Sequence, residues 1–291
     1  MSSFAITTDS ASDLSKSFLQ ENQISEMSLY YTIDDVTYGE GHEAPMDVKA
    51  FYQKMREGIL PKTQQVNPQQ AEEKFREHLD KGEDVLHIAF SSGVSGSCNS
   101  ARMAARELEE EYPDRKIIVI DSLTGSLGEA MVVIKAVRLR NQGKSLEETA
   151  QLLNEMIPNL RFYATVDDLK HLYRGGRLSK TAALLGSAIG IKPMITLDEE
   201  GKLSPKAKVR GRKQSIQALA DYVESHVGSC LAENDTIYIC HGDCEEDANT
   251  LAHMIEEKLG VHNFMIDYIG PVIGCHSGPG ALAVTFIGDI K

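Results

Sequence analysis

Residues 84–122, "DVLHIAFSSGVSGSCNSARMAARELEEEYPDRKIIVIDS", carry the pattern that decides the fold. The stretch begins and ends in continuous apolar runs, which are typical of strands buried on both faces of a parallel sheet. Between these runs, apolar residues recur at helical spacing after Ser97. A strand, a helix and a second strand in this order form a βαβ unit, so we predict an α/β fold with a mainly parallel sheet.

The same alternation extends on both sides of this unit. A further strand is predicted at residues 4–9, and a pair of strands at 25–33 and 35–40. Residues 1–160 are therefore predicted to form an N-terminal three-layer α/β/α domain. The helices expected in it, besides the one after Ser97, cover residues 46–58, 67–82, 128–143 and 146–157.

After residue 160 the pattern changes, because long helical segments separate only some of the apolar runs. This indicates a mixed six-stranded sheet that is covered mainly on one face. We assign residues 161–291 to a C-terminal α/β domain, packed closely on the first because no low-complexity linker separates them. The six strands are expected at residues 161–166, 192–197, 202–209, 236–241, 263–269 and 282–288.

The composition excludes several classes of protein. A net charge of −13 over 291 residues argues against nucleic-acid binding, which needs a surplus of lysine and arginine. No run of about 18 apolar residues is present, so no membrane span is expected. The N-terminus also lacks the basic region and apolar core of a signal peptide.

The five cysteines are expected to be reduced thiols. Their odd number and irregular spacing suit the cytoplasm better than a disulfide-bonded scaffold. Cys240 and Cys244 form a C-x₃-C pair, but the second pair that a structural zinc site would need is not nearby. We therefore interpret this segment as a strand end with incidental cysteines and expect no metal site.

Residues 91–97 form a Ser/Gly-rich loop between the first strand and the helix of the βαβ unit. Ligands of α/β folds bind at the carboxyl ends of strands, and the free N–H groups at a helix start favour an anion. Ser95 is thus a candidate donor to an anion, although Ser95 and Ser97 could instead only cap the helix. The run "GVSGS" lacks the last glycine of a hydrolase elbow, and no lysine follows Gly96 as in a phosphate-binding loop.

A second candidate site is the glycine-rich stretch of residues 269–282, "IGPVIGCHSGPGAL". Such a loop brings backbone close to a ligand, and the neutral imidazole of His276 can donate one hydrogen bond. The alternative is a turn histidine in solvent. We favour the ligand-binding loop, because little else demands this density of glycine.

Two basic segments stand out in a chain of negative net charge. Residues 169–180, "LKHLYRGGRLSK", hold Arg174 and Arg177, and residues 202–213, "KLSPKAKVRGRK", hold Arg210. A patch that recognises phosphate or an acidic partner is one interpretation. A solvated strand edge protected by lysines is the other.

In their order, and over nearly the whole chain, these segments resemble the DegV family. The resemblance implies a two-domain α/β protein that binds one fatty acid in an apolar tunnel, with the carboxylate at the domain junction. In Gram-positive bacteria, such proteins act as the acyl-carrying subunit of fatty acid kinase. The segments are ITTDSASDL (6–14), SSGVSGSCNSA (91–101), DSLTGSLGEA (121–130), LYRGGRLSKTAALLGSAIGIKP (172–193), YICHGD (238–243) and GPVIGCHSGPGALAV (270–284).

The resemblance also implies the ligands of the carboxylate, which are Thr63, Ser95 in the S-G-T-type turn and His276 in the G-x-H-x-G-P-G loop. This chain departs from the family twice. Residues 63–66 read TQQV where the family commonly has T-S-Q-P, and Ser97 replaces the threonine of S-G-T. Neither change removes a hydrogen-bond donor at the matched positions. The surrounding ligand loops are expected to contribute Gly96, Ser97, Gly274 and Ser277.

The energetics of burial are compatible with a fatty acid as the ligand. We expect no other cofactor. Burying about 14–16 methylenes at roughly 0.8 kcal/mol each contributes about 11–13 kcal/mol before ordering costs are subtracted. The tail can therefore supply the affinity. The head group then needs hydroxyl and imidazole donors, because an unpaired buried acceptor costs several kcal/mol.

The resemblance gives the basic segments a role as well. Arg174, Arg177 and Arg210 are expected to dock a partner kinase or to stabilise the acyl-phosphate that it makes. The chain is thus expected to be a non-catalytic cytoplasmic carrier, with no nucleic-acid partner and only transient membrane contact. The alternative is a stand-alone serine-dependent acyl hydrolase or transferase that uses Ser95 and His276. A third hypothesis, a lipid-responsive regulator, finds no DNA-binding module in the sequence.

Overall fold

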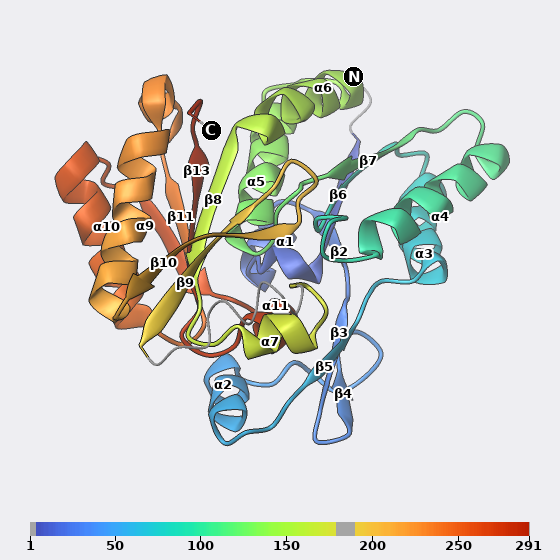
Figure 1. The fold of residues 1–291 in the computed structure, drawn as a ribbon. Coiled ribbons are helices and arrows are strands. Elements are labelled where there is room, and N and C mark those ends of the chain that lie inside the picture. Colours follow the sequence, from blue (N-terminus) through green and yellow to red (C-terminus); the bar gives the residue numbers. More distant parts are fainter. Residues whose placement is uncertain (1–3, 179–189, 291) are drawn as a thin grey trace.

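Three β-sheets, with helices packed between and around them, make up this computed structural model (Figure 1). It describes residues 4–178 and 190–290. Residues 179–189, which belong in part to the first basic segment and to one of the DegV-like segments, lie outside the described residues.

The first sheet is parallel and contains the predicted βαβ unit. Its elements are β1 (Ala5–Asp9), β2 (Ile24–Met27), β6 (Val85–Ala89), α4 (Ser97–Glu111) and β7 (Ile117–Asp121). The strands lie in the order β2-β1-β6-β7, and each neighbouring pair is parallel. Helix α4 joins β6 to β7, as the apolar spacing predicts. The mainly parallel sheet expected in the N-terminal half is therefore confirmed.

Helices cover both faces of the parallel sheet, which gives the three layers predicted. They are α3 (Pro68–Leu79), α5 (Leu127–Asn141) and α6 (Leu146–Met156), together with α4. Phe75 of α3 is fully buried in the core on one face, where α4 also packs. Leu153 of α6 is fully buried in the core on the opposite face, where α5 packs.

The second sheet is mixed and contains all six strands predicted after residue 160. They are β8 (Leu160–Thr165), β9 (Ile191–Leu197), β10 (Leu203–Arg210), β11 (Ile237–His241), β12 (Phe264–Tyr268) and β13 (Leu282–Ile287). Their order is β10-β9-β8-β13-β11-β12, and only β11 and β12 run parallel to each other. The predicted mixed six-stranded sheet is confirmed.

Helices α9 (Arg212–His226) and α10 (Glu245–Leu259) cover one face of the mixed sheet. The other face is not open as expected, because α5 packs against it and also against the parallel sheet. Helix α5 has buried side chains all around its circumference, the pattern of a helix enclosed by two layers. The core around α5 crosses residue 160 without a break, so the division into domains 1–160 and 161–291 stays a prediction.

A third, small sheet lies at the lower edge of the molecule in Figure 1. It consists of β3 (Tyr30–Ile33), β4 (Val36–Tyr38) and β5 (Lys62–Gln64), in the antiparallel order β4-β3-β5. The predicted pair of strands is confirmed as β3 and β4. The single strand predicted at residues 25–33 is wrong, because the chain leaves β2 in one sheet and enters β3 in another.

The pattern of buried residues explains this error. Met27, Leu29, Tyr31 and Ile33 are all buried, so the alternation continues across the point where the chain changes sheets. At that point the Leu29 N–H bonds to the Ser10 hydroxyl instead of to a neighbouring strand. A period of two shows which side chains are inside, but it does not show which sheet they join.

The glycine-rich stretch predicted as a loop is helical over α11 (Pro271–Ser277). Pro271 occupies the first helical position, where its missing N–H costs nothing, and Gly278 ends the helix with a φ of +76°. His276 therefore lies in the last turn of a helix. The remaining helices are α1 (Lys16–Glu21), α2 (Val48–Arg56) and α7 (Lys170–Arg174), with 3₁₀ turns at Ser10–Ser12, Ile157–Asn159 and Gly228–Glu233.

The helices of the described residues are all too short or too polar to cross a lipid bilayer.

Candidate ligand-binding cavity

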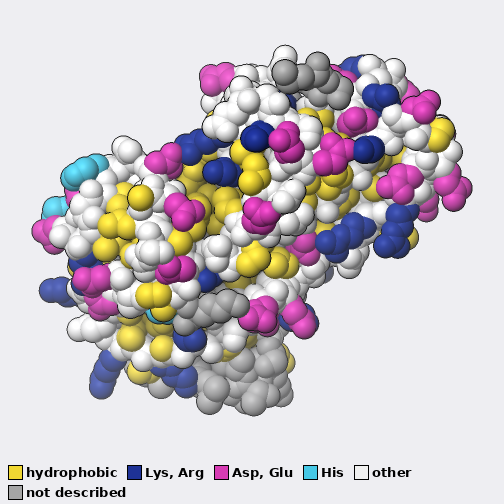
Figure 2. All heavy atoms as spheres, turned by 90° about the horizontal axis from the view of Figure 1, so that it is seen from above, with side chains coloured by type: hydrophobic (Ala, Val, Ile, Leu, Met, Phe, Trp, Pro, Cys, Tyr) yellow, Lys and Arg dark blue, Asp and Glu magenta, His cyan; other side chains and the backbone are white. Residues whose placement is uncertain are grey.

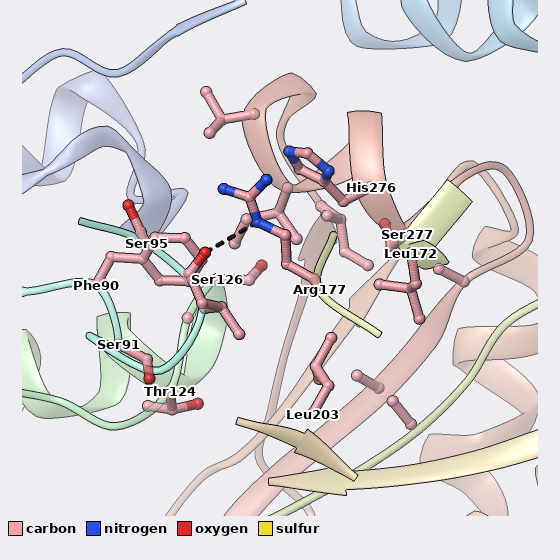
Figure 3. A pocket seen from close by; sticks show the side chains of 18 of the residues that line it. Phe90, Ser91, Ser95, Thr124, Ser126, Leu172, Arg177, Leu203, His276 and Ser277 are labelled. Carbon is pink, nitrogen blue, oxygen red and sulfur yellow. Dashed lines mark hydrogen bonds between the residues drawn. The ribbon is translucent and has the colours of Figure 1, made fainter. Parts of the chain in front are cut away.

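A cavity of about 470 Å³ lies between the parallel and the mixed sheet, within the range of about 300–1,000 Å³ typical of small-molecule sites. Seen from above, apolar side chains gather across the hollowed middle of the molecule (Figure 2). Loops at the carboxyl ends of β6 and β7 form one wall of the cavity, and the inner face of the mixed sheet forms the other. Figure 3 shows Phe90 and Ser126 on the first side and Leu203 on the opposite side.

The mixed sheet presents an apolar wall to the cavity. Phe162, Ala164 and Val166 alternate along β8 and just beyond it, so their side chains point to one face. Ala283 of β13 is paired with Ala164 and lies on the same face. The two paired alanines leave space that larger side chains would fill, which makes room for an apolar ligand.

The turn between β9 and β10 closes the cavity from one side. Leu203, at the end of this turn, lines the cavity. The Ser91 hydroxyl donates a hydrogen bond of 2.8 Å to the carbonyl of Gly201 in the turn. A Cβ on Gly93 would lie only 2.5 Å from the Glu200 carbonyl oxygen, so the two backbones touch with no side chain between them.

Two of the expected carboxylate ligands meet at the polar end of the cavity. Thr63 of β5 and His276 of α11 are 213 residues apart, yet Thr63 Oγ1 and His276 Nε2 lie 2.8 Å from each other. Both residues line the cavity. The small sheet and α2 pack around α11, and this packing brings the two side chains together. The Thr63 segment is strand β5, not the loop that the resemblance implied.

His276 is neutral at physiological pH. Its pKa is lowered to about 4, mainly by burial and also by the nearby charges of Arg177 and Arg174 and by His171. With its proton on Nε2, the imidazole donates to Thr63 Oγ1, which leaves the Thr63 hydroxyl proton for a ligand in the cavity. The pair therefore offers a hydrogen-bond donor without a formal charge.

Ser95 offers a second donor, because a neighbouring hydroxyl can donate to it as His276 donates to Thr63. Its Oγ accepts the Ser97 N–H at 3.2 Å and lies 3.0 Å from Ser97 Oγ. Ser97 Oγ in turn accepts the Val66 N–H at 3.2 Å. When the Ser97 hydroxyl donates to Ser95, the Ser95 proton is free for a ligand. Ser97 is thus the support of Ser95 and does not itself line the cavity.

The two readings of Ser95 left open by the sequence are changed by this geometry. The N-cap of α4 is Gly96, so neither Ser95 nor Ser97 is the N-cap residue, although Ser95 Oγ accepts the N–H of Ser97 at the start of the helix. His276 bonds to Thr63, and no hydrogen bond joins it to Ser95 among the described residues. The nucleophile–base contact that a serine hydrolase needs is therefore not formed.

The three arginines of the basic segments differ in their contacts, and their grouping into one patch stays a prediction. Arg177 lines the cavity, with Nε donating to the Val94 carbonyl at 3.0 Å and Nη1 to the Gly175 carbonyl at 2.5 Å. In the view of Figure 3 its guanidinium lies between Ser95 and His276. Arg174 is exposed nearby and reaches the carbonyl of residue 61 at 3.4 Å.

Arg210 does not line the cavity. It is exposed at the last position of β10, seven residues beyond Leu203 of the cavity wall. At about 3.3 Å per strand residue, the two positions are roughly 20 Å apart along the strand.

The other residues expected in the ligand loops divide into two groups. Ser277 lines the cavity, and its buried Oγ has no hydrogen-bond partner among the residues described. Gly274 faces α2 instead, since a Cβ there would lie 2.7 Å from Tyr52 Oη and 2.9 Å from a ring carbon of Phe51. The role of this glycine is to let α11 approach α2 closely. Gly96 lies against the side chain of Gln65.

Two aspartates that the residue-level reasoning did not single out hold the strand-end wall in place. Asp9 accepts the Phe90 N–H at 2.9 Å, and Asp13 accepts the Ser126 hydroxyl at 2.5 Å. Phe90 and Ser126 both line the cavity. Burial raises the pKa of Asp9 to about 6 and that of Asp13 to about 7. The sequence feature that could have indicated their role is the position of Asp9 and Asp13 at and just after the carboxyl end of the first predicted strand.

The cysteine pair does not form a metal site with its neighbours. Cys240 lines the cavity from β11, and Cys244 directly precedes α10. Burial raises the pKa of Cys240 to about 12 and that of Cys244 to about 11, so both are protonated thiols at neutral pH. Over residues 4–178 and 190–290, no three His, Cys, Asp or Glu side chains are grouped so that they could hold a metal ion.

Comparison with known proteins identifies the family. A family model described as "Uncharacterised protein, DegV family" matches residues 3–289. The chain belongs to the DegV family. It is 44% identical over 291 residues to a DegV domain-containing protein of Clostridium perfringens, with 100% of this chain and 99% of the relative covered. A DegV domain-containing protein of Streptococcus pyogenes serotype M3 is 37% identical over 286 residues, with 98% of each chain covered.

Solved structures of DegV proteins share the fold over the whole chain. The DegV fatty acid binding protein of Bacillus subtilis has a TM-score of 0.83 and 29% identity, covering 99% of this chain and 100% of its own. A DegV family protein of Thermus thermophilus, described by its fatty acid binding, has a TM-score of 0.84 and 28% identity, covering 98% and 99%. A stearic acid-binding protein of Eubacterium ventriosum has a TM-score of 0.85 and 26% identity, covering 98% of each chain.

Proposed function

We propose that this DegV protein binds one long-chain fatty acid in the cavity between its two large sheets. The alkyl chain lies along the apolar wall, and the carboxylate is held by Thr63, Ser95 and His276, with Ser277 beside them. One observation carries this proposal: Thr63, Ser95 and His276 lie together at one end of a cavity whose lining is otherwise mainly apolar. That division matches an amphiphile with one polar end. The fatty-acid-binding relatives support it.

The chemistry of the polar end suits a carboxylate. A buried carboxylate needs hydrogen-bond donors to replace the water it loses, and each unsatisfied acceptor costs about 1–3 kcal/mol or more. The relays behind Thr63 and Ser95 direct a hydroxyl proton toward the ligand from two sides. Arg177 adds a positive charge near the anion, although two of its nitrogens are engaged by backbone carbonyls.

We further propose that the protein is a cytoplasmic carrier that presents this carboxylate to a partner kinase. The kinase would transfer the terminal phosphoryl group of ATP to a carboxylate oxygen, giving an acyl-phosphate and ADP. Support comes from the mouth of the cavity, where Gln64, Gln65 and Asn67 are exposed around the polar end. A second protein can therefore approach the head group while the tail stays covered.

The arginines take two positions in this proposal. Arg174 and Arg177 flank the mouth of the cavity and are placed for a phosphorylated head group or for the kinase that makes it. Arg210 is exposed at the last position of β10 and does not line the cavity, so it is proposed to contact the partner rather than the ligand. The partner surface is thus proposed to span the region between α7 and the end of β10.

Mass spectrometry of the purified protein under native and denaturing conditions tests the proposal. A carrier shows the added mass of a long-chain acid under native conditions and loses it on denaturation. A covalent acyl group on Ser95 that survives denaturation would instead identify a hydrolase or transferase. Adding ATP and the partner kinase should convert the bound acid to its acyl-phosphate, and the carrier alone with ATP should not.

A further inference from the structure

Gln65 lies at the mouth of the cavity with its amide group packed onto Gly96. A Cβ on Gly96 would stand 2.2 Å from Gln65 Oε1 and 2.6 Å from Nε2. Gly96 has a φ of −82° and a ψ of −3°, a conformation open to any amino acid. Backbone strain therefore does not explain the glycine. The space that the Gln65 amide occupies does explain it.

The residues on both sides of Gln65 form hydrogen bonds with the proposed carboxylate site. Val66 donates its N–H to Ser97 Oγ, the same atom that supports Ser95. Thr63, two residues before Gln65, is bonded to His276. Thr63 and Gln65 both line the cavity. The backbone on both sides of Gln65 is thus held in place, and the amide lies against Gly96 in the turn that follows Ser95.

The amide of Gln65 has all of its hydrogen-bonding capacity free. A glutamine amide offers two N–H donors and one acceptor. Gln65 uses none of them on any residue of the described parts of the chain. By contrast, Gln69 donates to Glu73 at 3.0 Å, and Gln70 bonds to both Asn67 and Tyr30. An unpaired amide next to Gly96, and so close to Ser95, is suited to a ligand atom.

We propose that Gln65 is a further head-group ligand, whose amide N–H donates to the carboxylate oxygen nearest the mouth, and that Gly96 is glycine because a side chain there would displace this amide. The inference deepens the proposed function and rests on it. Gln65 adds a directed donor without adding charge, as the Thr63 and Ser95 hydroxyls do. The outer carboxylate oxygen is then bonded from one side only and stays open toward a partner protein.

Titration of the delipidated protein with stearic acid and with octadecanol, by calorimetry or displacement of a fluorescent fatty acid, tests this inference. Gln65→Ala should weaken stearic acid about tenfold, because a hydrogen bond to a charged acceptor is lost. It should weaken octadecanol much less, since the alcohol oxygen is uncharged. Gly96→Ala should reproduce both effects by displacing the amide, and the double variant should be no weaker than either single variant.

Gln65→Glu gives a pH-dependent affinity for stearic acid, which a purely structural role of Gln65 would not produce. A carboxylate at this position repels the ligand carboxylate, so stearic acid should bind more weakly than to Gln65→Ala at pH 8 and recover as the pH is lowered. Octadecanol should show no such pH dependence. Gln69→Ala is the matched control, because Gln69 has the same side chain on α3 outside the cavity, and it should bind both ligands as the unchanged protein does.

The outcomes separate the two proposals. If the unchanged protein binds stearic acid but Gln65→Ala and Gly96→Ala bind it within twofold of that value, the assignment of Gln65 is overturned. Equal losses for acid and alcohol would also overturn it, because they indicate a change in the cavity rather than in head-group recognition. If the unchanged protein binds neither ligand, the proposed fatty-acid function itself fails.

Discussion

The two walls of the cavity are built from different parts of their sheets. The parallel sheet meets the cavity with its strand ends, so turns that carry Ser95 and Ser126 face the ligand. The mixed sheet meets it with a flat face, so alternate side chains such as Phe162 and Ala164 do so. Strand ends expose N–H groups, hydroxyls and helix starts, whereas a strand face exposes only every second side chain.

Under the proposed function, this contrast explains how the fold would recognise an amphiphile. The polar groups and the apolar surface come from separate elements, so each can be varied without rebuilding the other. The small sheet and α11 complete the polar end by bringing Thr63 and His276 together. Variants of the strand face should therefore change affinity through the tail, and variants of the strand ends should change it through the head group.

Filling the apolar wall should have the largest effect on ligand affinity. In Ala164→Phe the ring occupies space that the alkyl chain would use. Excluding roughly four methylenes at about 0.8 kcal/mol each lowers affinity for a long-chain acid by about 100-fold or more. Calorimetric titration measures the loss, and Ala164→Val should show a smaller one. Unchanged affinity in Ala164→Phe would mean that the chain does not run along this wall.

Removing one donor from the polar wall should have a smaller effect. Ser95→Ala leaves a carboxylate acceptor unpaired, so fatty-acid binding should weaken by about 1–3 kcal/mol, or about 5- to 150-fold. Retention of the acid in native mass spectrometry and its dissociation constant both report this loss. Ser92→Ala, in the same loop but outside the cavity lining, is the control. Equal behaviour of the two variants would remove Ser95 from the head-group site.

The free energy of unfolding should depend on pH through the buried acids of the strand-end wall. The pKa of Asp13 is raised by burial from 3.8 to about 7, so the stability it contributes is complete below about pH 4 and is lost as pH rises through 7. Asp13→Asn removes this titration. Its free energy of unfolding should therefore fall less between about pH 5 and about pH 8 than that of the unchanged protein, by more than about 1 kcal/mol.

Urea unfolding at the two pH values measures this difference. Asp114→Asn, at an exposed position, should keep the pH dependence of the unchanged protein. The same dependence in Asp13→Asn would show that Asp13 does not titrate in this range in the folded state.

Arg174→Ala should have the smallest effect on ligand affinity. The side chain is exposed and does not line the cavity, so fatty-acid binding should stay within about twofold. Conversion of the bound acid to acyl-phosphate by the partner kinase should nevertheless slow, because Arg174 lies at the mouth where the partner approaches. Parallel assays of binding and phosphorylation separate the two. Equal losses in both would make Arg174 a structural residue.

Most of the fold could be predicted from local patterns. Continuous apolar runs located β6, β7 and the six strands of the mixed sheet, and capping residues and glycines placed the helix ends near their observed positions. Two of the failures share one cause. The burial pattern across residues 25–33 and the apolar circumference of α5 show that side chains are inside, but they do not show which layers enclose them.

The site was less accessible to local reasoning. Ser95 could be singled out because it follows a buried strand and precedes a helix, which is where α/β folds bind ligands. Thr63 was matched only through the family resemblance, because nothing in "PKTQQV" marks it. Gln65 was missed because its significance depends on Gly96, which is 31 residues away in the chain and beside it in the structure.

Short-range periodicity and motifs are enough to show that this is an α/β protein of the DegV family, with a polar loop at a strand end and an apolar mixed sheet. The tertiary structure alone decided that the loop and the sheet face each other across a cavity. It also decided that Thr63 bonds to His276 and that the Gln65 amide rests on Gly96. These contacts join residues far apart in the chain, and packing sets their geometry.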